Sequence, residues 1–129
     1  MKNLLKTAAV GAGVATACIA LASPALANSV SKAYGDGTIS YTDSSDSFCA
    51  YAYNSDGLRS VTVKLTPLSR SGPAPHWTDK NTYYSDGNSG STCKSLATAY
   101  EDTQYRAEVW TYWGERGTTI KVDNFTFYS

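Results

Sequence analysis

The fold is decided by QYRAEVWTYW (104–113), GERG (114–117) and TTIKVDNFTFY (118–128). Two runs rich in β-branched and aromatic residues flank a four-residue connection with a glycine at each end, which is typical of a β-hairpin. Successive side chains of a strand point to opposite faces. One face of the first run therefore holds Tyr105, Ala107, Val109, Thr111 and Trp113, and the other holds Arg106, Glu108, Trp110 and Tyr112. The charged pair on the second face predicts that this face meets water.

The second run of the hairpin is irregular. Ile120 and Val122 occupy even positions, whereas Phe125 and Phe127 occupy odd positions. A regular strand cannot bury both pairs on one face. We therefore expect a bulge or bend near Asp123-Asn124.

Strand patterns continue towards the N-terminus. We expect strands at Thr38–Thr42, at Ser47–Tyr53, at Ser60–Thr66 and, less regularly, at His76–Tyr84. The segment Ser91–Tyr100 allows either a strand or a short helical turn near its end. Pro- and Gly-rich segments interrupt these runs. About seven short strands with turns between them predict an all-β fold, a small antiparallel β-sandwich.

The cysteines predict one disulfide. Of the three cysteines, Cys18 lies in an N-terminal segment with the pattern of an export signal, which leaves Cys49 and Cys93. An even pair in a small exported domain is most simply a bridge. The chain-entropy model gives such a bridge about 4 kcal/mol. The nearest familiar plan is immunoglobulin-like, in which the disulfide joins the two sheets, but the tyrosine-corner position is Ser91 and Trp77 is misplaced for that family. The likeness extends to the general plan only.

The first 27 residues have the pattern of a secretory signal peptide. Lys2 and Lys6 precede an apolar run from Ala8 to Ala22, and Ser23–Ala27 ends in a small-x-small cleavage pattern. The run is too short to span a bilayer. Cys18 lies inside it and lacks the leucine three residues earlier that a lipid-attachment site prefers. We expect a secreted protein with residues 28–129 as a single domain.

The charge balance argues against some partners. The chain has eleven basic and eleven acidic residues, and cleavage removes two lysines but no acidic residue. A basic excess that could neutralise a phosphate backbone is therefore missing, and we expect no nucleic-acid partner. The sequence also has no basic amphipathic helix for a lipid surface, so we expect no membrane association after cleavage. The domain is expected to be a monomer.

The alanine-rich leader and the small domain with a cysteine pair resemble small proteins exported by Gram-positive bacteria, particularly actinobacteria. The resemblance is one of general style and implies no activity.

The aromatic supply suggests a binding surface. Trp110 and Tyr112 lie two residues apart on the face that also carries Arg106 and Glu108. Planar aromatic side chains on a rigid strand suit the C–H faces of sugar rings, and they suit protein partners equally well. The competing interpretation is that aromatic residues replace aliphatic ones in the core. We predict a non-catalytic protein that binds a polysaccharide or an extracellular protein through this face.

The loop LSRSGP (68–73) supports an alternative. A protease inhibitor presents an extended, preorganised loop, and here Arg70 would be the specificity residue and Arg70–Ser71 the scissile bond. A proline- and glycine-rich connection between strands is the simpler interpretation. A structural component of the cell envelope is a further alternative.

Catalysis is not expected. A Ser/His/Asp site would need His76, the single histidine, and no serine has the Gly-x-Ser-x-Gly pattern. A carboxylate pair for glycoside hydrolysis would come from Glu101, Asp102, Glu108 and Glu115. The acidic segments Asp43–Ser47 and Asp86–Asn88 lack EF-hand spacing and are interpreted as turns. We expect no metal and no cofactor.

Overall fold

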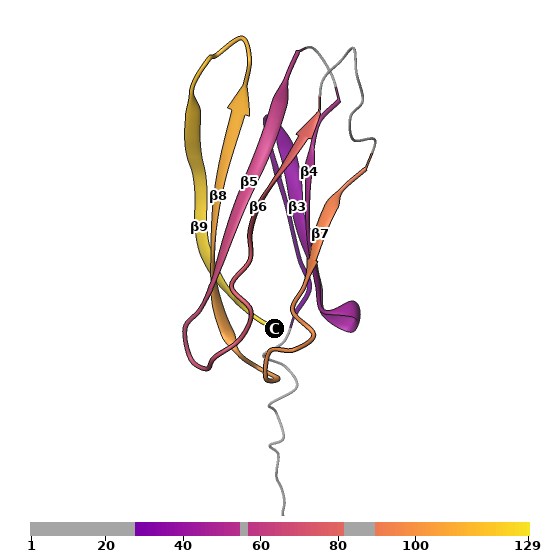
Figure 1. Ribbon diagram of the computed structural model, residues 1–129, viewed down its shortest axis with the longest axis vertical. Helices are drawn as coiled ribbons and strands as arrows, with labels where there is room; N and C mark the ends of the chain where they lie inside the picture. The colour runs from indigo at the N-terminus through magenta and orange to yellow at the C-terminus, as the bar shows by residue number, and fades with distance from the viewer. Residues whose placement is uncertain (1–27, 55–56, 82–89) are drawn as a thin grey trace, which may run out of the picture.

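The computed structural model describes residues 28–54, 57–81 and 90–129. These residues form two antiparallel sheets of four strands each, without an α-helix. Figure 1 shows the two sheets packed face to face as a sandwich. The predicted fold class, an all-β antiparallel sandwich with one disulfide, is confirmed. The predicted signal peptide, residues 1–27, lies outside the described residues.

The first sheet has the strand order β2-β3-β4-β7. Its strands are β2 (Val30–Tyr34), β3 (Gly37–Thr42), β4 (Ser47–Ala52) and β7 (Thr92–Ser95). The second sheet has the order β6-β5-β8-β9, with β5 (Arg59–Pro67), β6 (His76–Asn81), β8 (Gln104–Trp113) and β9 (Thr119–Tyr128). β5 and β8 are the inner strands of the second sheet, and each pairs along its length with two neighbours.

The predicted bulge is present in β9. Val109 pairs with Asp123, but the next residue, Trp110, pairs with Lys121, so Val122 is the extra residue. The bulge lies one residue before the expected segment Asp123-Asn124. It places Ile120 opposite Thr111 and Phe125 opposite Ala107, both inward positions of β8. The bulge therefore brings the even and the odd apolar positions of the strand to the same face.

Strand β2 was not expected from the sequence. Lys32 occupies an inward position, opposite Ile39 of β3, and this interrupts the apolar alternation. Its ammonium group lies 3.2 Å from an Asp123 carboxylate oxygen and 4.3 Å from the centre of the Phe125 ring. An inward-pointing charge on an edge strand discourages pairing with another chain.

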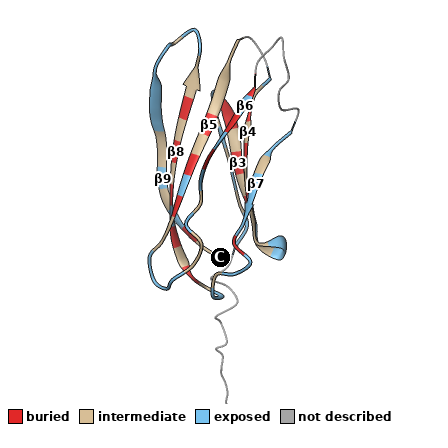
Figure 2. Cartoon of the chain, viewed as in Figure 1, coloured by how far each residue is buried: buried red, intermediate tan, exposed pale blue. Residues whose placement is uncertain are grey.

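The core lies between the sheets and is rich in aromatic rings. Figure 2 shows the buried residues alternating along the strands. The Phe127 ring lies 5.0 Å from Tyr41 and 5.7 Å from Tyr105, measured between ring centres. Phe48 meets Trp77 edge-on at 5.9 Å. Five of the fourteen buried hydrophobic residues are aromatic and the other nine are aliphatic, so the core uses only part of the chain's aromatic side chains.

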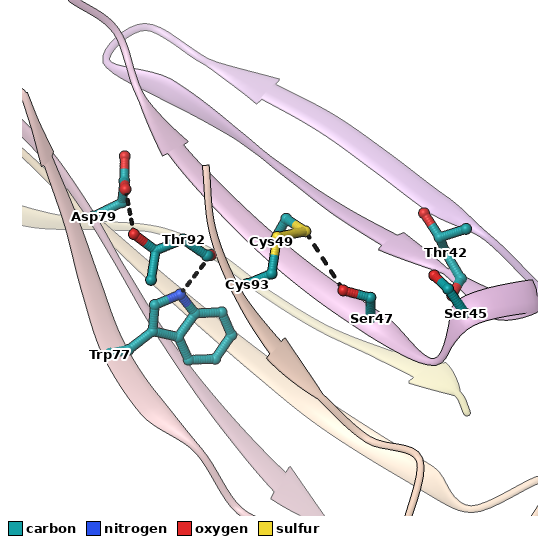
Figure 3. The surroundings of a disulfide bond; sticks show 8 residues. All are labelled: Thr42, Ser45, Ser47, Cys49, Trp77, Asp79, Thr92 and Cys93. Atoms are coloured by element: carbon teal, nitrogen blue, oxygen red, sulfur yellow. Dashed lines mark hydrogen bonds between the residues drawn. A yellow bond between two sulfur atoms is a disulfide. The ribbon is translucent and has the colours of Figure 1, made fainter. Parts of the chain in front are cut away.

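The disulfide departs from the immunoglobulin-like plan. Cys49 and Cys93 are bonded, with their Cα atoms 4.0 Å apart, and they are direct partners on the neighbouring strands β4 and β7. The bridge therefore lies within one sheet, on its outward side, instead of joining the two sheets. Figure 3 shows that the links between the sheets here are polar: Trp77 donates to the Thr92 carbonyl, and the Thr92 hydroxyl donates to Asp79.

Two expected turns are resolved. Asp43–Ser45 forms a short 3-10 turn, η3, between β3 and β4. After β7 the chain makes one turn in which the Ala99 N–H donates to the Leu96 carbonyl, so Ser91–Tyr100 combines a strand with a turn. The segment Asp86–Asn88 and the last three residues of the expected strand His76–Tyr84 lie outside the described residues.

Candidate ligand-binding face

Strand β8 has the two faces that the sequence predicts. Tyr105, Ala107, Val109 and Thr111 are buried in the sandwich. On the opposite side Arg106 is exposed, and Glu108, Trp110 and Tyr112 are partly exposed. Trp113, at the end of the strand, was expected to point inward. It is partly exposed, and the Arg59 guanidinium lies 4.6 Å from the centre of its ring.

The outward side chains of β6, β5, β8 and β9 form one surface, which we call the Trp110 face. Trp110 lies in the middle of it, because β8 is flanked on both sides by paired strands. Its direct partners are Thr62 on β5 and Lys121 on β9. Thr62 in turn pairs with Thr78 on β6, and their hydroxyl oxygens are 2.7 Å apart. The centre of the face therefore consists of an indole ring, two hydroxyls and an ammonium group.

The Trp110 ring is flanked by two other side chains. The centre of the His76 imidazole lies 6.3 Å from the centre of the indole, and the two planes are inclined by 33°. The Lys121 Nζ lies 5.1 Å from the same ring. A cation–π contact at an exposed position contributes only about 0.5–1 kcal/mol. Lys121 is exposed, so this contact with the indole adds little stability.

Tyr112 extends the aromatic surface along the strand. It lies two residues from Trp110 on the same face, which corresponds to a separation of about 7 Å along β8. Its direct partners are Ser60 on β5 and Thr119 on β9. Both neighbours are small and polar, so a hydroxyl group lies on each side of the phenol ring.

Glu108 is held by an ion pair on this face. Lys121 Nζ lies 2.8 Å from Glu108 Oε1. The hydrogen bond from Lys121 holds the pKa of the Glu108 carboxyl below its ordinary value, against a smaller opposing effect of burial, and Lys64 and Arg106 add to the lowering. Glu108 is therefore ionised throughout the neutral range, and Lys121 links it to Trp110. The structure thus brings Trp110, Tyr112 and Glu108 together with the exposed Arg106.

The Arg70–Ser71 loop lies away from this face, at the end of the sandwich where β5 turns into β6 (Figure 1). Both residues are exposed. The Ser69 hydroxyl accepts a hydrogen bond from the Gln104 N–H at 2.9 Å, and the Tyr105 hydroxyl donates to the Pro73 carbonyl at 2.8 Å. The loop is thus tied to β8 on both sides of the Arg70–Ser71 bond.

The residues considered for catalysis lie in separate places. His76 is exposed on the Trp110 face beside the indole. Glu101 and Asp102 precede β8, Glu108 is near its middle, and Glu115 follows it. Asp102 lies in a turn before β8, and Glu108 is four residues into the strand, about 13 Å along it from Gln104. A glycosidase pair needs a separation of about 5–9.5 Å. That the protein is not an enzyme stays a prediction.

Sequence reasoning missed the cations that neighbouring strands contribute to the Trp110 face. Lys64 on β5, Lys80 on β6 and Lys121 on β9 all point outward and are exposed. The alternation of side chains within each strand predicts on which side of the sheet each lysine lies. It does not predict which strands are neighbours, and so it could not bring the three lysines to one surface. A second missed cluster is structural: the buried Asp36 receives hydrogen bonds from Arg59 at 2.9 Å and from Arg116 at 3.1 Å.

No family model, curated protein or solved structure matches this chain. Over residues 28–54, 57–81 and 90–129, no helix is long and apolar enough to cross a membrane. The same ranges contain no cluster of three or more residues suited to hold a metal ion. The part of the chain that the structure describes also forms no pocket, so the Trp110 face is an open surface.

Proposed function

We propose that this protein is a secreted, non-catalytic protein that binds a polysaccharide through the Trp110 face. The observation that carries the proposal is the position of Trp110 and Tyr112. They lie side by side, partly exposed, on the outward side of an inner strand. Aromatic side chains whose polar atoms and ring surfaces are both accessible are favoured at binding surfaces.

The setting of these rings favours a sugar chain over a compact ligand. The face is open, and β8, which carries both rings, is held by pairing on both sides, so the rings keep a fixed spacing along the strand. Hydroxyl groups of Ser60, Thr62 and Thr119 adjoin the rings in the sheet register. Stacking on a ring combined with hydrogen bonds to hydroxyls is the chemistry that a pyranose needs.

Two features support an extracellular location. The leader has the pattern of a signal peptide. The Cys49–Cys93 disulfide fits an oxidising compartment, because disulfides are rare where cellular thiols keep proteins reduced.

The proposal is tested by affinity electrophoresis of residues 28–129 in gels that contain single polysaccharides, both neutral and acidic. We expect retardation by at least one of them, and its loss in Trp110→Ala and Tyr112→Ala. Tyr51→Ala is the matched control, because Tyr51 is partly exposed on the outward side of the other sheet. Unchanged retardation in Trp110→Ala, or equal loss in Tyr51→Ala, contradicts the proposal. If the protein binds an extracellular protein and no polysaccharide, the proposed polysaccharide ligand is wrong and the ligand is a protein.

A second candidate function is protease inhibition through Arg70–Ser71. The hydrogen bonds from Gln104 to Ser69 and from Tyr105 to Pro73 favour it, because a loop held on both sides of a scissile bond is preorganised. The test is incubation with trypsin. Stoichiometric loss of trypsin activity that disappears in Arg70→Ala supports inhibition, whereas cleavage after Arg70 without loss of trypsin activity contradicts it.

A further inference from the structure

The charged residues of the Trp110 face are mostly of one sign. Four cations point outward from the sheet: Lys64, Lys80, Arg106 and Lys121. All four are exposed. The one carboxylate that the described strands add to this face is Glu108, and Lys121 already neutralises it at 2.8 Å. Salt bridges to Lys64, Lys80 or Arg106 are absent among the described residues. Among the described residues, the face therefore has an excess of positive charge.

This excess is local, because the whole chain has equal numbers of acidic and basic residues. The outward side of the other sheet is neutral in the described strands. It carries Thr38, Ser40 and Tyr51 around the disulfide. Two of the chain's carboxylates, Asp36 and Asp79, are buried. In the described strands, the Trp110 face is thus positively charged and the opposite broad surface of the sandwich is neutral.

The cations follow the length of the face. We call residues that are paired across neighbouring strands a row of the sheet. Lys80 and Tyr112 both pair with Ser60 and so share one row, and Lys121 pairs with Trp110 in the next. Lys64 is in the row of Glu108, and Arg106 occupies the next. Successive rows are about 7 Å apart along the strands. One cation in each row, each from a different strand, makes a positively charged strip on which the two aromatic rings also lie.

We propose that the ligand of the Trp110 face is an acidic polysaccharide, a sugar chain that carries carboxylate, phosphate or sulfate groups. This inference rests on the proposed function and adds the charge of the ligand to it. Lysine and arginine side chains form charge-assisted hydrogen bonds to any of these anionic groups. The aromatic rings stack on the sugar rings between them. A neutral polysaccharide would gain no charge-assisted contact from the four cations, and a ligand that carried charge alone would gain nothing from Trp110 and Tyr112.

Polymers of matched backbone test the inference. Binding of residues 28–129 is measured by affinity electrophoresis with polygalacturonate and with its methyl-esterified form, in which the carboxylates are blocked. Dextran sulfate and a sugar-phosphate polymer, each compared with an uncharged counterpart, identify the anionic group. We expect the charged member of at least one pair to bind about tenfold or more tightly than the uncharged member, and to weaken as the salt concentration rises from about 0.05 M to about 0.5 M.

Charge variants locate the binding. In Lys64→Gln/Arg106→Gln we expect affinity for the acidic polymer to fall about tenfold, whereas Lys94→Gln, an exposed lysine on β7, leaves it unchanged. Trp110→Ala should also weaken binding. Equal binding of charged and uncharged polymers, lost in Trp110→Ala, overturns this inference and leaves polysaccharide binding standing. Binding of polyglutamate or duplex DNA as tightly as the acidic sugar polymer, unaffected by Trp110→Ala, overturns it in favour of charge alone. No binding to any polymer overturns both proposals.

Discussion

The Tyr34 hydroxyl on β2 donates a hydrogen bond of 2.7 Å to Asp123 Oδ2 on β9 and joins the two sheets across one edge of the sandwich. Lys32 approaches the same carboxylate oxygen at 3.2 Å. Burial and the hydrogen bond to Asp123 together raise the pKa of Tyr34 well above its ordinary value. Asp123 lies directly after the bulged residue Val122 and occupies an inward position opposite Val109.

Removal of the hydroxyl in Tyr34→Phe should lower the free energy of unfolding by about 1–2 kcal/mol, because the hydrogen bond is to a charged group and is partly buried. Urea unfolding measures the change. The control is Tyr51→Phe on the outward side of the other sheet, which should change stability by no more than a few tenths of a kcal/mol. An equal loss in both variants contradicts the assignment.

The stability of the fold should fall at acid pH in a way that depends on Asp123. Burial raises the pKa of this carboxyl, but the hydrogen bonds from Tyr34, from the Asn124 N–H and from Lys32 together outweigh burial and lower it. A lowered pKa in the folded state means that the stabilisation is present above the ordinary value of about 3.9 and is lost as the pH falls through the lower folded value. Asp123→Asn should therefore be less stable at pH 7 and lose less stability between pH 7 and acid pH. An unchanged pH profile contradicts this role.

The disulfide should account for a large part of the stability. Cys49 and Cys93 are 44 residues apart in sequence, for which the chain-entropy model gives about 4 kcal/mol. We expect Cys49→Ala/Cys93→Ala to lower the melting temperature by on the order of 20 °C. Because Cys93 is exposed, a phosphine reductant should reach the bridge in the folded protein and produce the same shift. A melting temperature that neither change affects would contradict the prediction.

The bulge predicts which single-residue deletions β9 tolerates. Deletion of Val122 leaves Lys121 opposite Trp110 and Asp123 opposite Val109, so the pairing becomes regular and no face is reversed. The expected loss is about 1–2 kcal/mol, from the packing of Val122 on the core. Deletion of Thr126 turns Phe127 outward and should cost about 3–5 kcal/mol. Circular dichroism melting curves compare the two variants, and equal destabilisation would show that the bulge does not set the register.

Glu108 should restrain the binding of acidic ligands. Glu108→Gln removes the carboxylate that holds Lys121, so the ammonium group becomes available to an anionic ligand. We expect affinity for an acidic polysaccharide to rise several-fold, with affinity for a neutral one unchanged. Titration calorimetry measures both. Weaker binding of the acidic polymer would mean that Glu108 itself contacts the ligand.

Much of the fold could be predicted from period-two patterning. In β8 alternation alone identified both faces, and in β9 the clash between the positions of Ile120 and Phe125 predicted a bulge. Strand β2 could not be predicted, since Lys32 at an inward position breaks the pattern and is tolerated only because Asp123 and Phe125 lie across from it.

The candidate site was predictable only along one strand. Trp110 and Tyr112 share a face because they are two residues apart, whereas Lys64 and Lys121 join them through strand pairing. Sheet order is not encoded in the alternation of any single strand. The same limit applies to the disulfide, because the sequence separation of Cys49 and Cys93 does not show whether their strands belong to one sheet or to two.

The most direct test of the central claim, that the Trp110 face binds a polysaccharide, is the position of the bound sugar on the protein. Isotope-labelled residues 28–129 are titrated with oligogalacturonate and with a neutral oligosaccharide, and amide chemical shifts are followed by NMR. We expect the shifts to concentrate on β5, β8 and β9 around Thr62, Trp110 and Lys121, with Tyr51 unaffected. Shifts confined to the outward side of β3 and β4 or to the Arg70 loop, or the absence of any shift, would contradict it.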